Sequence, residues 1–509
     1  MTRRANVIGG GPGGLYAARL LKLNDPGLEV VVHERTDASR ATFGFGVGLT
    51  EATMRNLEQA DPETADRVRV VSYVGHELRF DAPDRSVCLH GARNLAVGRA
   101  ELLRVLREAA TEVGVEYRAG SRADLGTVTG DVVIAADGVG SATRTKLSAE
   151  LGVRTTLGRT RYVWCGAPFA ASSAFFAAAR RGPELFVTHA YPYAEDRSTF
   201  LIEVDDETWT SAGLAEFDAA TGPGETDRQS VRLLENVLSD QLRGGELLTN
   251  RTRWSRFVNL GLDRWHSGNV VLLGDAAHTA HYTLGSGTKL ALEDAIALAG
   301  ALTGESSPSA AFAAYEQARR PAVERFKQLA GRSQRWWDSY RWRADWSAER
   351  LGLSYMTRSG NITMADYARS EPEVVRAALE WLGSAPTGDP EEWVLAQPLR
   401  GNGFQLPSRV TTRADLGPVE ELSWTEPDVW SEPADDTVAR AGRGSGPLLL
   451  TGAAEEFWAR VDLAERLRLQ TSRCVGVQLP ESARAFAATS IGAGRADFAV
   501  FEDFPRRNS

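Results

Sequence analysis

The apolar positions of the chain form two patterns, short and mainly apolar runs and runs with helical spacing. Short, mainly apolar runs stand at 5–8, 28–33, 132–136 and 270–273. Such runs predict strands that are buried on both faces, as in a parallel sheet. Helical spacing is found at 15–23, 100–113 and 288–302. Because strands alternate with helices, we predict an α/β fold with a Rossmann-like domain.

A different pattern begins at residue 161. Residues 162–169, 184–193 and 198–204 read as strands joined by short turns, which predicts an antiparallel sheet in a separate layer. We expect aromatic side chains to line one face of that sheet, and most of them to be core residues. They are Trp164, Phe186, His189, Tyr191 and Phe200.

The second half of the chain predicts further helices and a small C-terminal layer. Residues 311–329 have helical spacing with a junction expected at Pro321, 332–351 is rich in Trp and Arg, and 386–392 has the composition of a linker. Residues 447–450, 474–477 and 498–501 are predicted strands. Residues 455–469 and 481–490 are predicted helices. These elements permit a small parallel α/β domain.

Composition narrows the function. The 509 residues carry a formal net charge of −9, which argues against a general nucleic-acid binder. No apolar run reaches the length that spans a membrane, and the N-terminus lacks a signal-peptide core, so we expect a cytoplasmic protein. The three cysteines, Cys88, Cys165 and Cys474, have no metal-binding spacing, and we predict no metal site.

The first apolar strand runs directly into a glycine-rich turn, Gly9 to Gly14, with the spacing GxGxxG. In a dinucleotide site Gly9 permits the tight turn, Gly11 lets the backbone approach a pyrophosphate, and Gly14 lets the helix pack on the strand. The second strand ends at Glu34, where a carboxylate can accept hydrogen bonds from ribose hydroxyls. The motif predicts a dinucleotide site but does not separate FAD from NAD.

Two further segments add to this motif. Asp137-Gly138 ends one buried strand and is followed six residues later by Arg144. Gly274-Asp275-Ala276-Ala277-His278 ends another and precedes Gly285-x-Gly287, which opens a helix whose first turn carries positive partial charge. Glycines alternate at 44, 46 and 48, so that segment can lie flat against a planar ligand.

The three segments together resemble the FAD-dependent aromatic hydroxylases of the para-hydroxybenzoate hydroxylase type, over residues 1 to 385. Residues 43–47 and 274–289 are similar to hydroxylase domains that act on aromatic acyl-CoA thioesters, as in salicylyl-CoA 5-hydroxylase and anthraniloyl-CoA monooxygenase/reductase. Residues 161–204 are also similar to indole-pathway hydroxylases of violacein biosynthesis. In many relatives prolines follow the histidine of GDAAH, whereas this chain has His281 and Tyr282 there.

The resemblance implies an oxygenase that uses FAD, NADH or NADPH, and O2 to oxidise an aromatic ring through a flavin C4a-hydroperoxide, with a substrate carried on CoA. We expect a monomer or homodimer that acts in aromatic catabolism or natural-product biosynthesis. The candidates for activating the substrate are His281, Tyr282, His189 and Tyr191. The residues expected to bind FAD are Gly9, Gly11, Gly13, Gly14, Glu34, Arg35, Phe45, Gly46, Val47, Arg99, Asp137, Asp275, Gly285, Gly287 and Thr288.

The same resemblance suggests four parts. They are an FAD-binding domain (1–75, 95–155 and 250–330), a substrate domain (76–94 and 156–249), a helical segment with a linker (331–390) and a C-terminal α/β domain (391–509). Residues 397–410 and 485–502 resemble the opening and the closing strand region of an old-yellow-enzyme barrel. A complete barrel needs about 250 residues, so 391–509 is predicted to be a noncatalytic remnant without FMN, with an unrelated α/β cap as the alternative.

Three other functions stay open at this point. One is a different oxidation on the same fold, such as ring epoxidation or oxygenolysis of a thioester. The second is an FAD reductase or oxidase without oxygenase activity, and the third is a catalytically silent scaffold. Oxygen-18 from O2 in the product, together with substrate-stimulated NAD(P)H oxidation, would separate them.

Overall fold

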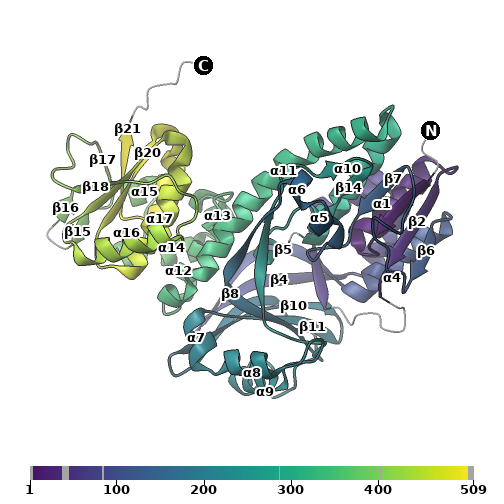
Figure 1. Cartoon of the computed structure of the whole chain (residues 1–509). Coiled ribbons are helices and arrows are strands. Elements are labelled where there is room, and N and C mark those ends of the chain that lie inside the picture. Colours follow the sequence, from purple (N-terminus) through teal and green to yellow (C-terminus); the bar gives the residue numbers. More distant parts are fainter. Residues whose placement is uncertain (1–3, 37–44, 83–84, 286, 402–403, 503–509) are drawn as a thin grey trace. The chain divides into compact units, whose positions relative to one another are not determined.

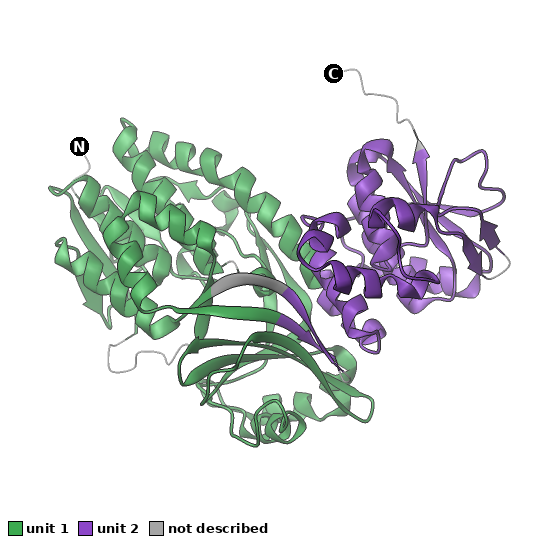
Figure 2. Ribbon diagram, turned by 180° about the vertical axis from the view of Figure 1, so that it is seen from behind, with its two compact units in different colours: residues 1–78, 92–334 green, residues 79–91, 335–509 purple. Residues whose placement is uncertain are grey.

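The computed structural model describes residues 4–36, 45–82, 85–285, 287–401 and 404–502. Residues 41–44 of the segment predicted to lie against the ligand are outside the described residues, as are 286 and 402–403. The chain forms two compact units (Figure 2): unit 1 has residues 1–78 and 92–334, and unit 2 has residues 79–91 and 335–509. The finer division into four parts stays a prediction.

A six-stranded sheet forms one layer of unit 1, in the order β13-β14-β7-β1-β2-β6. Its neighbouring strands pair in parallel except at the edge strand β13. Helices α1 (Pro12–Asn24), α4 (Arg99–Glu112) and α10 (Gly287–Gly304) lie beside it (Figure 1). The predicted Rossmann-like domain is confirmed. The strands are β1 (Arg4–Ile8), β2 (Glu29–Glu34), β6 (Glu116–Ala119), β7 (Val132–Ala135), β13 (His266–Ser267) and β14 (Val270–Leu272).

A second sheet has eight strands in the order β12-β8-β11-β10-β9-β4-β5-β3. The pairs β8–β11 and β11–β10 are antiparallel, as predicted. The pairs β10–β9, β8–β12 and β3–β5 are antiparallel as well. The strands are β3 (Gly46–Leu49), β4 (Tyr73–Asp81), β5 (Ser86–Gly98), β8 (Arg154–Ala167), β9 (Ala174–Arg181), β10 (Glu184–Ala194), β11 (Arg197–Val204) and β12 (Ser255–Gly261). The remaining helices of this part of the chain are α2 (Glu51–Ala60), α3 (Pro62–Val70), α5 (Ala142–Lys146), α6 (Ser148–Leu151), α7 (Asp206–Ser211), α8 (Leu214–Ala220) and α9 (Arg228–Val237).

The two faces of this sheet differ. Phe186 and Phe200 are fully buried in a cluster with Leu234 of α9. Successive residues of a strand point to opposite faces, so His189 of β10 lies on the other face. The expectation that Phe186 and Phe200 share a face with Trp164, His189 and Tyr191 is therefore wrong. The sequence pattern does not reveal which of two half-aromatic faces a covering helix occupies.

Helix α11 (Pro308–Asp338) runs without interruption through Pro321, so the junction predicted there is also wrong. Proline removes one helical hydrogen bond and usually costs about 3 kcal/mol in a helix interior. The buried side chains of Phe312, Tyr315 and Val323 anchor the helix on both sides of the proline. Among the described residues, none of the helices combines the length and the apolar character needed to cross a membrane.

Unit 2 contains a five-stranded parallel sheet in the order β17-β21-β20-β19-β18, so its first strand pairs with its last. The predicted strands and helices near 448, 475, 498, 457 and 484 are present. The strands of the unit are β15 (Leu399–Gly401), β16 (Phe404–Leu406), β17 (Val410–Thr411), β18 (Glu420–Ser423), β19 (Leu448–Thr451), β20 (Val475–Pro480) and β21 (Phe498–Glu502). The helices are α12 (Ala348–Thr357), α13 (Met364–Ser370), α14 (Pro372–Ala378), α15 (Pro390–Ala396), α16 (Glu432–Arg443), α17 (Phe457–Gln470) and α18 (Arg484–Gly492).

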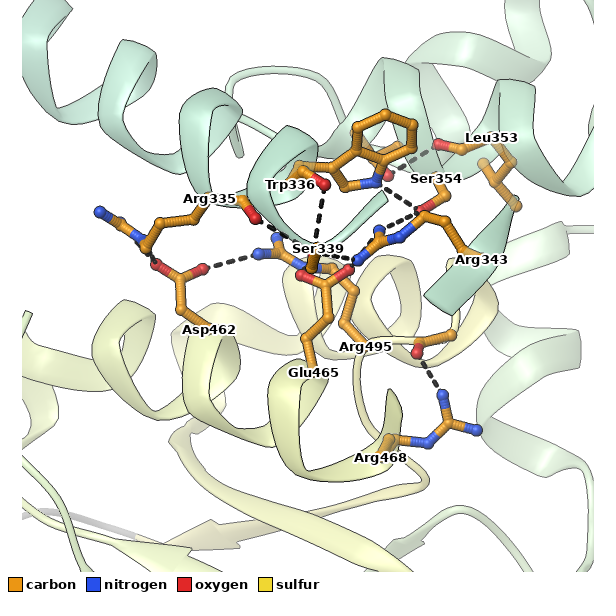
Figure 3. A network of polar contacts seen from close by, with 12 residues as sticks. Arg335, Trp336, Ser339, Arg343, Leu353, Ser354, Asp462, Glu465, Arg468 and Arg495 are labelled. Carbon is orange, nitrogen blue, oxygen red and sulfur yellow. Dashed lines mark hydrogen bonds and ion pairs between the residues drawn. The ribbon is translucent and has the colours of Figure 1, made fainter. Parts of the chain in front are cut away.

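A buried ion-pair network joins α17 to the helical segments that precede it in unit 2 (Figure 3). Glu465 lies 2.7 Å from Arg343 Nη1 and 3.0 Å from Arg495 Nε, and Arg343 is fully buried. Asp462 pairs with both Arg335 and Arg495, each at 2.6 Å. Buried charges of this kind require complete pairing, so the network fixes how α17 packs inside the unit.

Candidate active site

The carboxyl ends of four parallel strands bring the separate sequence motifs of unit 1 together. β1 ends before Gly9, β2 ends at Glu34, β7 ends two residues before Asp137 and β14 ends three residues before Asp275. Parallel neighbours place these ends at the same edge of the sheet. Ligands of open α/β sheets bind in the crevice at this edge, so the four segments form the candidate cofactor site.

The glycine turn after β1 leaves one of its faces open. Gly9 has φ 112°, and a Cβ there would lie 2.2 Å from Ala136 O. A Cβ on Gly14 would lie 2.2 Å from Gly9 O, and one on Gly13 would lie 2.4 Å from Leu273 Cδ2, so both glycines serve helix packing. A Cβ on Gly11 would meet nothing within 4 Å. The open space at Gly11, at the start of α1, is what a phosphate needs to approach the backbone.

Glu34 is held against this turn by backbone donors. Gly10 N donates to Glu34 Oε2 at 2.8 Å, and Thr36 N donates to Glu34 Oε1 at 2.8 Å. The carboxylate is therefore fixed at the tip of β2 with lone pairs left for ligand hydroxyls. Arg35, the next residue, is exposed.

Arg144 ties two of the motifs to each other. Its guanidinium donates to Val139 O in the turn after β7 and to Ala276 O (3.0 Å) in the segment after β14. Burial lowers the pKa of Arg144, and the neighbouring carboxylates of Asp137 and Asp275 oppose that shift. Asp137 Oδ2 accepts from Thr143 N at 3.1 Å, whereas Oδ1 is buried and has no hydrogen-bond partner among the described residues. One oxygen of Asp137 is thus left for a ligand.

Asp275 combines deep placement with accessible surface. Its side chain is exposed, yet burial raises the pKa of its carboxyl group. The charges of His278, Arg99 and Arg144 act to lower this pKa, and that of Asp294 acts to raise it. The carboxylate is thus close to several charged groups and still accessible to a ligand.

A buried network of charged residues holds the segment that carries Asp275. His278 Nε2 lies 2.7 Å from Asp294 Oδ2, and Arg319 Nε donates to Asp294 Oδ1 at 2.9 Å. Asp294 also accepts from Gly274 N at 3.1 Å and is fully buried. Burial acts to raise the pKa of Asp294, but His278 and Arg319 outweigh it and hold the pKa low. This network fixes the backbone at Asp275.

The second glycine segment lies close to Asp275. Gly285 has φ 63° and open space at its Cβ position. Helix α10 begins at Gly287, where a Cβ would lie 3.6 Å from Asp275 Oδ1, and Thr288 follows in its first turn. The first turn of a helix carries positive partial charge, so this end can face an anionic part of a cofactor.

The hydroxyl of Tyr191, another candidate for substrate activation, is bound to strand β3. Tyr191 Oη donates to Gly46 O at 2.5 Å, and Gly46 N donates to Thr199 Oγ1 at 2.9 Å. Arg99 N donates to Phe45 O at 3.0 Å. Burial raises the pKa of Tyr191 to about 12. Val47 follows in β3 and is part-buried, so the segment Phe45–Val47 is anchored on both sides.

The other three candidates gather around a residue that the motifs did not indicate, Glu203 of β11. Tyr282 Oη donates to Glu203 Oε1, and His189 Nε2 lies 3.2 Å from Glu203 Oε2. The ring of His281 lies 4.1 Å from that of Tyr282. Burial acts to raise the pKa of Glu203, but His189, His281 and Tyr282 hold it below its usual value, so the carboxyl group is ionised at neutral pH.

Aromatic rings surround this carboxylate on the face of the sheet opposite to the covering helices. The centroid of Tyr282 lies 4.8 Å from that of Tyr162 and 6.2 Å from that of Trp164, and Phe257 lies 4.7 Å from His281. Burial raises the pKa of Tyr162, and both Glu203 and Asp275 raise it further. The ring of Tyr162 thus belongs to the aromatic face, 6.5 Å from Trp164 and 4.8 Å from Tyr282.

Comparison with known proteins identifies the family to which the chain belongs. A family profile described as an FAD binding domain matches residues 2–125 and 120–330. Salicyloyl-CoA 5-hydroxylase from a Streptomyces species is 36% identical over 427 residues, which is 80% of this chain and 78% of the relative. The chain belongs to the FAD-dependent aromatic monooxygenases. The family predicted from the motifs is thus confirmed.

A second relative and a solved structure agree with this monooxygenase family. The 3-hydroxy-4-methyl-anthranilyl-[aryl-carrier protein] 5-monooxygenase of Streptosporangium sibiricum is 38% identical over 365 residues, 72% of this chain and 97% of the relative. The structure of 2-methyl-3-hydroxypyridine-5-carboxylic acid oxygenase has a TM-score of 0.53 at 23% identity and covers 72% of this chain and 98% of its own. That likeness shows the fold. The monooxygenase is an oxidoreductase with FAD as its cofactor, O2 as oxidant and NAD(P)H as the reductant typical of the family.

Proposed function

We propose that this monooxygenase oxidises an aromatic ring that is carried as a thioester on CoA or on a carrier protein. The observation that carries the proposal is the pair of relatives, each more than 35% identical, whose names specify a CoA-linked and a carrier-protein-linked aromatic substrate. Ring epoxidation, oxygenolysis of the thioester and a reductase or oxidase reaction without oxygen transfer are the alternatives.

The residues at the carboxyl edge of the sheet fit FAD. Gly11 offers open space for the pyrophosphate, Asp137 Oδ1 is a buried acceptor without a donor among the described residues, and Asp275 is an accessible carboxylate. When bound, FAD supplies the activation of O2 and the transfer of one oxygen atom to the ring. In this proposal the adenosine end of FAD is held by Glu34 and Arg35. The central part of the cofactor is held by Arg99, Asp137 and Asp275, and the flavin ring is held by residues 45–47 and 285–288.

We assign the substrate ring to the aromatic face beside Tyr282. A phenol or amine on the ring reacts faster when it has lost a proton, and the chain can take that proton. The substrate O–H or N–H bond breaks as Tyr282 Oη accepts its proton, and Tyr282 passes its own proton to Glu203. His189 holds the second oxygen of Glu203 at 3.2 Å. His281 orients Tyr282. His281 is itself held in place, because its Nδ1 lies 3.0 Å from Thr283 Oγ1, and that hydroxyl oxygen lies 2.7 Å from Ser333 Oγ.

The thioester proposal is tested by comparing salicylate with salicyloyl-CoA, and anthranilate with anthraniloyl-CoA, in the same assay. We expect the thioesters to stimulate NAD(P)H oxidation at least tenfold more than the free acids, and oxygen-18 from O2 to appear in the product. The expected discrimination is about 1.4 kcal/mol or more. Equal turnover of acid and ester would contradict a thioester site. Stimulated oxidation without labelled product would favour the reductase or oxidase alternative.

Asp275→Ala should weaken FAD binding about 10- to 100-fold while the protein stays folded. The reason is that the loss of a hydrogen bond in a buried site costs about 1–3 kcal/mol. Titration of the apoprotein with FAD, followed by flavin fluorescence, measures the change. Asp66→Ala is the matched control, because Asp66 is an exposed acid on α3. Unchanged FAD affinity in Asp275→Ala would remove Asp275 from the site.

For residues 391–509 we propose a noncatalytic remnant of an old-yellow-enzyme-like barrel. The pairing of β17 with β21 supports it, since the first and last strands of a (β/α)8 barrel are neighbours. Release of the flavin from the purified protein tests this proposal. One FAD per chain is expected, and FMN or a second flavin in the released material would contradict a remnant.

A further inference from the structure

Arg350, in the first turn of α12, is a positive charge without a counter-ion among the described residues of unit 2. Its guanidinium carbon lies 3.7 Å from the ring centroid of Trp346 and 4.4 Å from that of Trp381. Across the described residues its side chain has no hydrogen bond or ion pair, and its Nε is buried without a partner. Neighbouring arginines differ, because Arg343 pairs with Glu465 and Arg468 lies 2.8 Å from Asp497.

The surroundings of Arg350 make the lack of a counter-ion energetically unfavourable. Burial, together with the positive charges of Arg468 and Arg343, lowers its pKa to about 9. The side chain still carries a full charge at neutral pH. A desolvated charge is normally paired with an opposite charge. Stacking on two indoles compensates only part of that requirement, so the charge of Arg350 is incompletely compensated among the described residues.

The same residue lines a cavity of 210 Å³. The cavity is bounded by the N-cap of α12, Ser347, and by Arg85, Glu349, Glu380 and Trp381. A cavity of about 150 Å³ holds a benzene molecule, so this one has room for a small ring with a charged group. The positive end of α12 adds to the field at its N-cap.

The two glutamates do not neutralise Arg350. Glu349 Oε1 lies 2.6 Å from Arg85 Nη1, so that pair is balanced. Glu380 is exposed, and its charge contributes to the raised pKa of Arg376 on α14. The unbalanced charge at the cavity is therefore that of Arg350.

We propose that this cavity of unit 2 binds a small phosphorylated or carboxylated molecule, with Arg350 as the counter-ion and Trp381 against any ring that the ligand carries. The guanidinium presents a planar set of donors that matches either anion. Serving as a ligand site, the cavity would give unit 2 a role that is separate from the oxidation in unit 1.

Calorimetric titration of the FAD-loaded, full-length protein in chloride buffer tests the proposal. The three probes are inorganic phosphate, adenosine 3′,5′-bisphosphate and benzoate, which distinguish a simple anion, a nucleotide phosphate and an aryl carboxylate. At least one should bind, and Arg350→Gln should weaken that binding about tenfold or more. Arg376→Gln is the control, since Arg376 is an exposed arginine that pairs with Glu373.

A second measurement, the unfolding temperature, shows whether the Arg350 variants remain folded. In chloride alone, Arg350→Gln should unfold at the same temperature as the wild type or higher, because it removes an unpaired buried charge. Arg350→Lys keeps the charge and should retain part of the binding, which provides the comparison if the glutamine variant does not fold. The proposal is overturned if none of the three probes binds to the wild type, or if Arg350→Gln binds them as tightly as Arg376→Gln does.

Discussion

Replacing Glu203 with glutamine should lower product formation by about 10²- to 10⁴-fold, the range typical of general acid–base catalysis, with FAD content unchanged. The amide keeps the shape of the side chain but cannot take the proton that Tyr282 passes on. Stopped-flow measurement of product formation with the best thioester substrate gives the rate. Tyr282→Phe should cause a similar loss, and the double variant should be no worse than either single variant, because the two residues act as one relay.

The pH profile separates this role from a purely structural one. In Glu203→Gln the rate should rise about tenfold per pH unit until the substrate ionises by itself, since a substrate that has already lost its proton no longer needs the relay. Glu195→Gln, at the exposed turn between β10 and β11, is the control and should keep the wild-type rate and profile. A wild-type rate in Glu203→Gln, or a loss that is independent of pH, would contradict the relay.

Glu465→Ala should destabilise unit 2 by about 3–5 kcal/mol, the cost of breaking a buried ion pair. The variant leaves Arg343 fully buried without its carboxylate partner and removes one of the two partners of Arg495 (Figure 3). Urea unfolding followed by tryptophan fluorescence reports on the unit, since Trp336 and Trp337 are buried in it. Glu373→Ala, which breaks an exposed pair on α14, should cost less than about 1 kcal/mol.

Two further comparisons sharpen this expectation. The double variant Arg343→Met/Glu465→Leu should recover most of the lost stability, because apolar side chains replace the whole pair. Burial acts to raise the pKa of Glu465, but Arg343 and Arg495 hold it below its ordinary value of 4.5. Its stabilisation is therefore complete above that value and is lost as the pH falls towards the folded-state pKa. A pH-independent difference between wild type and Glu465→Ala would contradict this assignment.

The cofactor edge could be predicted from the sequence because each of its parts adjoins a short apolar strand. Gly9, Glu34, Asp137 and Asp275 stand at or within three residues of a strand end, and parallel pairing then places them at one edge. Local pattern and topology rules are sufficient for this step. The parallel sheet itself could be predicted for the same reason.

The aromatic site could be predicted only in part, because it depends on register between distant strands. Glu203 meets His189 across 14 residues and Tyr282 across 79. A single acid in an apolar strand, TFLIEV, was the available signal, since a buried carboxylate requires partners. Phe186 and Phe200 were assigned to the wrong face because alternation gives two faces without saying which one a helix covers.

The pairing of β17 with β21 leaves β18 and β17 as the open edges of the unit 2 sheet, and this affects how the protein behaves at high concentration. An unpaired strand edge is a template for association between molecules. Here β17 has two residues, and β18 carries Glu420 and Glu421, which lie beside Arg473 and Arg413. Short length and charge are the means by which natural sheets avoid edge-to-edge aggregation. The open sheet of unit 2 can therefore remain colloidally stable without closing into a barrel.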